Sequence, residues 1–263
     1  MVRRARKKSR SGIYHIIMRG VNRQTIFEEE EDRNRFLEIL KKYKTISEYK
    51  IHSYCLMDNH IHLLWEESEK ECLANSIKRI SSSYVYWYNH KYERSGHLFQ
   101  ERFKSENVES ADYFLTVLRY IHQNPLKAGI ANNISECKWT SYHEYFSCGD
   151  LVDTELGLRL YAKEKTKAVH LYLEHMQQIN DDQCLDIKVK IIKTDQEVRN
   201  YLYQLGVYNT SSLQQMDKKD RDAILAKIKM MEGTSLRQLE RITGISKSVI
   251  GRARDGGTGQ LSR

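Results

Sequence analysis

Two histidines separated by one residue, His60 and His62, are the first feature of this sequence that could do chemistry. They fall in a short run that is predicted to be a β-strand. Side chains alternate between the two faces of a strand, so both imidazoles would project to one side while Ile61 projects to the other. Two neutral imidazoles one step apart on a rigid strand form half of a site for a divalent metal ion. The same pair could equally be polar surface on an exposed sheet, so the spacing alone does not decide.

A tyrosine and an asparagine further along the chain, Tyr120 and Asn124, form a second candidate group. Their i,i+4 spacing places them on one face of a predicted helix, apart from its apolar stripe. A tyrosine hydroxyl, with an ordinary pKa of about 10, is a poor nucleophile. It becomes useful where a cation stabilises the phosphate it attacks, and an amide oxygen can complete the shell of that cation. Taken alone, Tyr120 is one of 17 tyrosines and could be an ordinary helix residue.

The hydrophobic pattern predicts the elements that would position these groups. Strands are predicted at 13–19, 51–57, 60–65 and 103–108, and helices at 32–47, 71–89 and 111–124. The last helix is expected to end at Asn124, because Pro125 disfavours a helical residue before it and cannot continue the helix. The order β-α-β-β-α-β predicts an α+β fold of the ferredoxin-like (split βαβ) kind. Its antiparallel sheet would carry two helices on one face and leave the other face open.

The C-terminal part of the chain has a different pattern. Residues 149–216 are predicted to form a polar, largely helical connector of unknown role. Within 217–263, Ser235 and Gln238 have the spacing of a capping box, in which both side chains satisfy the first backbone N–H groups of a helix. A turn containing Gly244 follows, and then a helix that begins at Lys247 and is capped by Ser246.

This arrangement is that of a helix-turn-helix, which would bind DNA through outer basic residues such as Lys247 and Arg252. Glu240 stands where that motif usually has a small residue. A plain three-helix interaction module would have the same spacing.

Composition narrows the class of protein. The 263 residues include 43 Lys and Arg against 35 Asp and Glu, a net charge of +8, and 40% are hydrophobic. The chain therefore has material for a core and is neither disordered nor fibrous. No run approaches the ~20 apolar residues that span a bilayer, and no apolar stretch follows the basic start as in a signal peptide. Five scattered cysteines fit a reducing compartment, so a cytoplasmic protein is expected.

The positive charge favours an acidic partner, of which nucleic acid is the commonest. Arg19 and Arg23 flank the first strand, and Arg102 and Lys104 lie near the fourth, where a DNA backbone could cross. The basic arm at 1–12 could follow phosphates or merely solubilise the chain. The aromatic run at 84–88, beside Lys78 and Arg79, could stack on bases or belong to the core.

A series of motifs between residues 13 and 146 carries a resemblance to a known family. They are YHIIMRG at 14–20, YCLMDNHIHLL at 54–64, GHLFQ at 96–100, RFKS at 102–105, YIHQNPLKAG at 120–129 and WTSY at 139–142. In this order they resemble the single-tyrosine HUH transposases, and most closely the REP-associated tyrosine transposases, which are domesticated relatives of insertion-sequence transposases. Asp58 departs from the family, which usually has proline there; the change affects the turn and not the metal-facing side chains.

The resemblance implies a mechanism. His60 and His62 would hold Mg²⁺ or Mn²⁺, with Asn124 as third ligand; His122 and Gln123 are neighbours that could replace it, although i,i+4 stacking favours Asn124. Tyr120 would attack a phosphodiester in single-stranded DNA near a hairpin, giving a 5′-phosphotyrosine and a free 3′-OH that can rejoin strands. The nuclease domain would span 13–148. A bacterial, nucleoid-associated protein, acting as a monomer or a homodimer, is expected.

Two other functions remain open from the sequence. One is a non-catalytic regulator that retains the fold and binds DNA through its C-terminal helices. The other is a phosphotransfer enzyme of another class that acts on RNA, to which a ferredoxin-like sheet is also suited.

Overall fold

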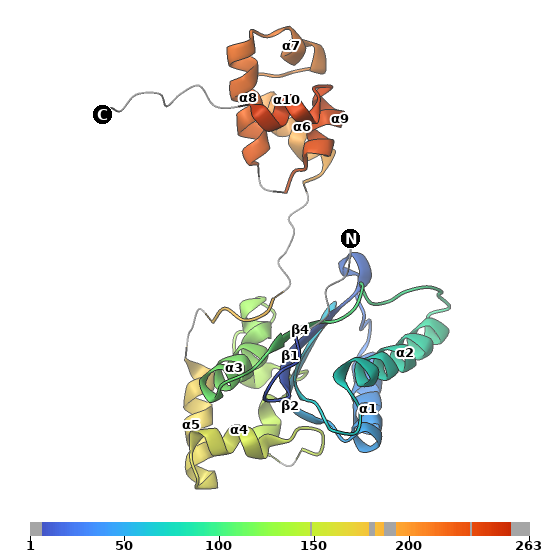
Figure 1. Cartoon of the computed structure of the whole chain (residues 1–263), viewed down its shortest axis with the longest axis vertical. Helices are drawn as coiled ribbons and strands as arrows, with labels where there is room; N and C mark the ends of the chain where they lie inside the picture. The colour runs from blue at the N-terminus through green and yellow to red at the C-terminus, as the bar shows by residue number, and fades with distance from the viewer. Residues whose placement is uncertain (1–6, 148, 179–181, 187–192, 232, 254–263) are drawn as a thin grey trace, which may run out of the picture. The chain divides into compact units, whose positions relative to one another are not determined.

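The computed structural model describes residues 7–147, 149–178, 182–186, 193–231 and 233–253. The chain divides into two compact units, Met1–Ile187 and Lys188–Arg263 (Figure 1). This boundary differs from the predicted ones at 148/149 and 216/217.

The first unit is built on a four-stranded sheet in the order β2-β3-β1-β4, with every neighbouring pair antiparallel. Its strands are β1 (Ile13–Arg19), β2 (Lys50–Met57), β3 (His60–Glu66) and β4 (Lys104–Asn107). The helices α1 (Glu30–Ser47) and α2 (Leu73–Lys91) pack together on one face of this sheet (Figure 1). The α+β fold with split βαβ order, predicted from the sequence, is therefore confirmed.

The second face of the sheet is covered, contrary to the prediction that it stays open. Helix α3 (Ala111–Lys127) packs against β2 and β3 on the side opposite α1 and α2 (Figure 1). Its stripe of Phe114, Val117, Leu118 and Ile121 is buried as predicted. Ser110 caps its start by accepting the Tyr113 N–H at 3.2 Å.

Helix α3 does not end at Asn124 as predicted, since it continues through Pro125 to Lys127. A proline in a last turn removes only one backbone N–H. The turn is closed by other donors: Ala128 N–H binds the Asn124 carbonyl, and Ile130 N–H binds the Pro125 carbonyl. Gly129, in the left-handed region at φ +69°, makes that reversal possible.

Two helices that were assigned to the connector belong to the first unit. Helices α4 (Thr154–Tyr161) and α5 (Lys165–Gln177) pack against α3 and extend its core. The buried Tyr172 of α5 donates its hydroxyl hydrogen bond to the Tyr142 carbonyl and lies 3.1 Å from His122 Nδ1. The domain around the sheet is thus longer than the predicted 13–148.

The second unit consists of α6 (Asp195–Gln204), α7 (Thr210–Gln215), α8 (Lys218–Met230), α9 (Leu236–Thr243) and α10 (Lys247–Arg252). Its core combines Val198 and Leu202 of α6 with Leu239, Ile242 and Ile250 of α9 and α10. A module beginning at 217 would lack part of this core, so the predicted start was too late.

The helix caps in the second unit differ in detail from the prediction. Ser235 accepts the Gln238 N–H as expected, but the Gln238 side chain donates to the Lys193 carbonyl and to Asp195 instead of closing a capping box. The Ser246 side chain makes no cap hydrogen bond. The Glu240 carboxylate accepts the Lys247 N–H at 3.0 Å, so the residue that departs from the usual motif caps α10.

Candidate active site between the sheet and helix α3

The four residues singled out by their chemistry come together between β3 and α3. Alternation along β3 turns His60 and His62 toward α3, where the i,i+4 pair Tyr120 and Asn124 faces them. The His62 and Tyr120 ring centroids are 5.8 Å apart, with the rings edge to face, and the two histidine rings are 5.0 Å apart. Groups that are distant in the sequence thus share one small volume.

The remaining ring nitrogens are held in a common orientation. His60 Nδ1 lies 2.6 Å from Asn59 Oδ1, and His62 Nδ1 lies 3.0 Å from Nε2 of His15 on the neighbouring strand β1. Asn59 Oδ1 can only accept, so His60 carries its proton on Nδ1. The buried Nε2 of His62 has no hydrogen-bond partner in the described part of the chain. The His62 Nε2 is therefore left available for a ligand.

His15 is a functional candidate that the sequence analysis missed. It shares the sheet face of His62 because Ile17, two residues on, pairs directly with His62. Its ring stacks on His62 at 5.3 Å and meets Tyr120 at 5.7 Å, and it is fully buried. Alternation along the predicted strand 13–19, combined with the correct strand pairing, would have found it.

Burial sets the protonation of these imidazoles. It lowers the pKa of His15 to about 3 and holds the pKa of His62 well below its ordinary value, an effect that neighbouring His15 and His60 reinforce. The pKa of His60 is also lowered, mainly by burial. All three rings are therefore neutral at pH 7, which is the form with a lone pair to give to a cation.

The Asn124 amide is within hydrogen-bonding reach of both His60 and Tyr120. Its two neighbours point elsewhere: His122 binds Ser141 and Tyr172, and Gln123 donates to the carbonyls of Met176 and Gln178. Within the described ranges, no group of three or more His, Cys, Asp or Glu side chains is arranged to hold a metal ion. A three-ligand site at the histidines would therefore need the Asn124 oxygen.

Tyr120 lies in a closed environment, with only 5% of its surface exposed. Burial raises the pKa of its phenol, and the nearby Asp186 carboxylate, which is hydrogen-bonded to it, raises it further. The Lys127 ammonium sits 4.7 Å from the ring centroid. The phenol is therefore protonated at pH 7, with a carboxylate positioned beside its hydroxyl.

The segment 182–186, which brings Asp186 to the site, is fixed to the first unit by polar contacts. Asp182 forms a two-point ion pair with Arg119 of α3 at 2.9 Å, and the Leu185 N–H binds Glu106 of β4 at the same distance. Nothing in the pattern of this polar stretch pointed to the site, so the sequence analysis missed Asp186.

The turn between β2 and β3 is anchored by Asp58, at which the chain departs from the family motif. Its carboxylate pairs with Arg33 of α1, and its carbonyl accepts the Ile26 N–H at 2.7 Å. The adjacent Asn59 carbonyl accepts the Gly20 N–H. Any side chain at Gly20 would collide with the Gln24 carbonyl, because an added Cβ would lie 2.2 Å from that oxygen. These contacts fix the residue that orients His60.

A comparison with known protein families finds one match in the first unit. Residues 8–124 match the model of a family described as IS200-like transposases. This segment of the first unit therefore has the sequence pattern of that family. The family predicted from the motifs is thus confirmed, and the match ends at Asn124.

Solved structures of two transposases resemble the chain. A REP-associated tyrosine transposase bound to a REP hairpin has 18% identity and a TM-score of 0.48, over 58% of this chain and 94% of that one. A candidate transposase from Deinococcus radiodurans has 15% identity and a TM-score of 0.34, over 49% of this chain and 99% of that one. No curated protein matches the chain.

The basic residues predicted to bind DNA lie at different places in the transposase domain. Arg19 pairs with His60 across β1 and β3, so it adjoins the candidate site, and its guanidinium binds Gln100. Arg102 and Lys104 are exposed just before and at the start of β4. Arg23 is exposed in the turn after β1.

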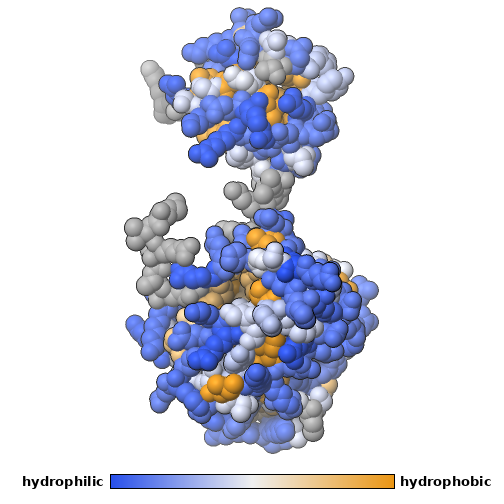
Figure 2. Space-filling model, turned by 90° about the vertical axis from the view of Figure 1, so that its right-hand side faces the viewer, coloured by the Kyte–Doolittle hydropathy of each residue, from blue (hydrophilic) through white to orange (hydrophobic). Residues whose placement is uncertain are grey.

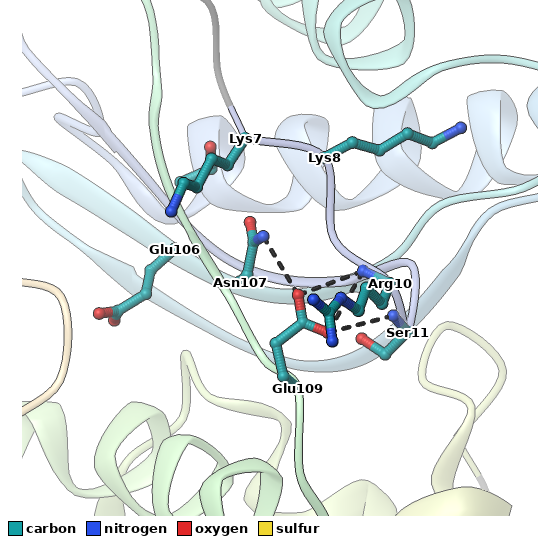
Figure 3. Close-up of a pocket in the computed structure, with 8 residues that line it drawn as sticks. Lys7, Lys8, Arg10, Ser11, Glu106, Asn107 and Glu109 are labelled. Carbon is teal, nitrogen blue, oxygen red and sulfur yellow. Dashed lines mark hydrogen bonds between the residues drawn. The ribbon is translucent and has the colours of Figure 1, made fainter.

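The described end of the basic arm lies along β4 (Figure 3). Its Arg10 and Ser11 N–H groups donate to Glu109, and a cavity of about 930 Å³ lies beside Lys7, Lys8 and Arg10. Arg3, Arg4 and Arg6 of the predicted arm lie outside the described residues. Lys247 and Arg252 are exposed on α10 of the second unit. None of the described helices is long and apolar enough to cross a membrane.

Proposed function

We propose that the transposase domain cleaves and rejoins single-stranded DNA beside a hairpin, with Tyr120 as the nucleophile. The observation that carries the proposal is the approach of the Tyr120 ring to His62, whose buried Nε2 has no partner among the described residues. A phenol, two neutral imidazoles and an amide in one closed volume suit attack on phosphorus, which needs alignment and charge neutralisation.

The residues present fit a divalent metal ion. The Nε2 atoms of His60 and His62 and the Asn124 oxygen would hold Mg²⁺ or Mn²⁺, and an orphaned buried nitrogen is otherwise costly. Such an ion, when bound, polarises the scissile phosphodiester and offsets the negative charge that develops on it. Asn59 and His15 each hold one of the two rings through its Nδ1 atom, so that Nε2 would be the atom that binds the ion.

A side chain of the protein can accept the proton that Tyr120 loses when it attacks. As the Tyr120 oxygen bonds to phosphorus, the bond to the 3′ oxygen breaks, leaving a 5′-phosphotyrosine and a 3′-OH. The raised phenol pKa means that the proton leaves during attack. Asp186 is the carboxylate beside that hydroxyl, and we assign it the role of acceptor. Attack by a 3′-OH on the phosphotyrosine reverses the step and rejoins strands without an external energy source.

The DNA substrate is proposed from charge and from the similar structures. The REP-associated relative was solved with a REP hairpin, and exposed cations such as Arg102 and Lys104 lie along the sheet edge of this domain. The cations Lys247 and Arg252 on the α9–α10 pair would add duplex contacts in a helix-turn-helix.

The test is a covalent adduct. Incubate the full chain with Mn²⁺ and a 3′-labelled hairpin library that has a randomised single-stranded flank, and resolve the products on a denaturing gel. Wild type should give labelled protein, and Tyr120→Phe should give none. Tyr113→Phe is the matched control. It removes the hydroxyl of a half-buried tyrosine that lies two turns earlier in α3 and binds Glu106. An adduct that survives Tyr120→Phe rejects the assignment.

A non-catalytic regulator is the second candidate, and the near-complete burial of Tyr120 favours it. Hairpin binding without any adduct in Mg²⁺, Mn²⁺, Co²⁺ or Ni²⁺ would support that reading. If an RNA version of the hairpin competes better than the DNA, the substrate is RNA instead.

A further inference from the structure

A second cavity of about 330 Å³ opens at the end of β1, between α2 and the segment 99–103. Met18 of β1 and Ile77 of α2 are buried in its lining, and the half-buried rings of Phe99 and Phe103 also line it. This volume accommodates one planar heterocycle and part of a sugar. Two aromatic side chains beside an apolar floor are the usual partners of an unstacked base.

Three cations, Arg19, Lys78 and Arg102, and one exposed carboxylate, Glu101, also line the cavity. Lys78 and Arg102 are exposed, and Arg19 is partly exposed. The Ser82 hydroxyl lies among them and can donate or accept hydrogen bonds at the edge of a base, whereas the Ser81 hydroxyl already donates to the Ile77 carbonyl and can only accept there. An apolar interior with a rim in which three cations outnumber one carboxylate is complementary to a nucleotide, in which a flat base is joined to a phosphate.

The cavity adjoins the candidate active site through one residue. Met18 and Arg19 are consecutive on β1, so their side chains leave opposite faces of the sheet. Arg19 pairs with His60 across the strands and also lines the cavity. A strand that passes over Arg19 from the histidines would therefore present its next bases to this cavity.

The exposed surface around α1 and α2 does not suggest a broad protein interface. Figure 2 shows this side of the domain as mostly hydrophilic, with small separate hydrophobic patches. Stable protein interfaces need a much larger contiguous area. A single inserted group fits the surface better than a protein partner does.

We propose that this cavity binds one unpaired nucleobase of the single-stranded DNA that the active site cleaves. The proposal rests on the proposed function for the identity of the strand. It assigns Phe99 and Phe103 to stacking on the base and Arg102 and Lys78 to the adjoining phosphates. The cavity would thereby set how far the strand is drawn across the sheet before it reaches Tyr120.

The test compares binding to dT12 with binding to a twelve-nucleotide strand of abasic sites, by fluorescence anisotropy of the full chain in EDTA. Wild type should prefer dT12 by about tenfold, since stacking is lost with the base. Ser82→Phe fills the cavity from an exposed position and should abolish this preference while leaving abasic affinity unchanged. His90→Phe, which places a phenyl ring on α2 outside the cavity, should behave as wild type. Arg102→Ala should weaken both ligands alike.

A photo-cross-link locates the base independently. A dT12 strand with one 5-iodouracil should cross-link to the peptide that contains Phe99 and Phe103. Cross-links confined to other peptides, equal affinity of wild type for dT12 and the abasic strand, or an undiminished preference in Ser82→Phe would each overturn the proposal. The adduct assay with Tyr120 tests the two proposals separately. Loss of the base preference would reject the base site but not the cleavage, and absence of an adduct would reject the cleavage but not the binding of a base.

Discussion

The candidate site between the sheet and α3 differs from the α9–α10 surface in the burial and charge of its side chains. The first places buried, neutral groups with defined ring orientations: His15 and His62 are fully buried and hydrogen-bonded to each other. The second presents charged ends to solvent, with Lys247 and Arg252 exposed on a short helix. Covalent chemistry at phosphorus needs positions fixed to fractions of an ångström, whereas phosphate attraction needs only charge near the strand.

Substitutions in these two regions should differ in their effects. A buried group that orients another cannot be replaced by solvent, so its loss spreads to the groups that it holds. An exposed cation acts almost alone, and its loss is screened and partly compensated by neighbours. Effects should therefore fall from the buried site to the exposed surface.

The largest loss is expected from His62→Ala. Removing one of the two imidazoles eliminates a proposed ligand and leaves a void beside Tyr120, so adduct formation should fall by about a hundredfold or more. Isothermal titration with Mn²⁺ should show the ion-dependent heat disappear. His52→Asn is the control, because His52 is also a buried sheet histidine but binds Glu66 and the Asp153 carbonyl. Unchanged Mn²⁺ binding in His62→Ala would show that His62 is not a metal ligand.

A smaller loss is expected from His15→Phe. Phenylalanine keeps an aromatic ring but cannot bind His62 Nδ1, so His62 loses the partner that fixes its orientation. Mn²⁺ affinity should drop about 10–100-fold while the fold is retained. His15→Asn, which keeps a polar partner, should recover part of the affinity. If Phe and Asn weaken Mn²⁺ binding equally, the hydrogen bond is not what His15 supplies.

Stability should depend on pH because of buried neutral histidines. Burial lowers the pKa of His15 and of His122 to about 3. Between that value and the ordinary 6.5, the unfolded chain binds protons that the folded chain does not. The free energy of unfolding should therefore be highest above pH 6.5. Below that pH it should fall by up to about 1.4 kcal/mol per pH unit for each such histidine. Urea titrations between pH 7 and 5 measure this slope, and His15→Phe should reduce it.

The smallest effect is expected from Lys247→Ala on α10. One exposed phosphate contact should cost a few-fold in hairpin affinity and reduce the slope of log affinity against log salt by about 1. Glu174→Ala, an exposed change on α5 of the transposase domain, is the control. If the salt dependence of hairpin affinity is identical in wild type and Lys247→Ala, Lys247 of α10 does not contact the DNA.

Local patterns predicted the sheet and its histidines because strand alternation and helical spacing are decided within a few residues. His60 and His62 share a face, and Tyr120 and Asn124 stack, for reasons that hold in any context. The end of α3 could not be read this way. Pro125 lies in a last turn whose hydrogen bonds are completed by Ala128 and Ile130, and these local bonds at the helix end allow the helix to continue past the proline.

Long-range packing decided the remaining features. His15 joins the site only once β1 is known to pair with β3, and Asp186 only once Asp182 has bound Arg119. The domain boundary was misplaced because α4 and α5 look polar in sequence, while Tyr172 is completely buried against α3. Glu240 departs from a local motif because it caps α10 across the turn.

The most direct measurement of the central claim is the identity of the residue that becomes linked to DNA. The adduct formed by wild-type protein with Mn²⁺ and a hairpin oligonucleotide can be digested with protease and nuclease and sequenced by tandem mass spectrometry. We expect a single peptide that contains Tyr120 joined to a nucleotide through its 5′-phosphate, and its disappearance in His62→Ala. Modification of another tyrosine, or an undiminished Tyr120 adduct in His62→Ala, would contradict a single centre built from that phenol and those imidazoles.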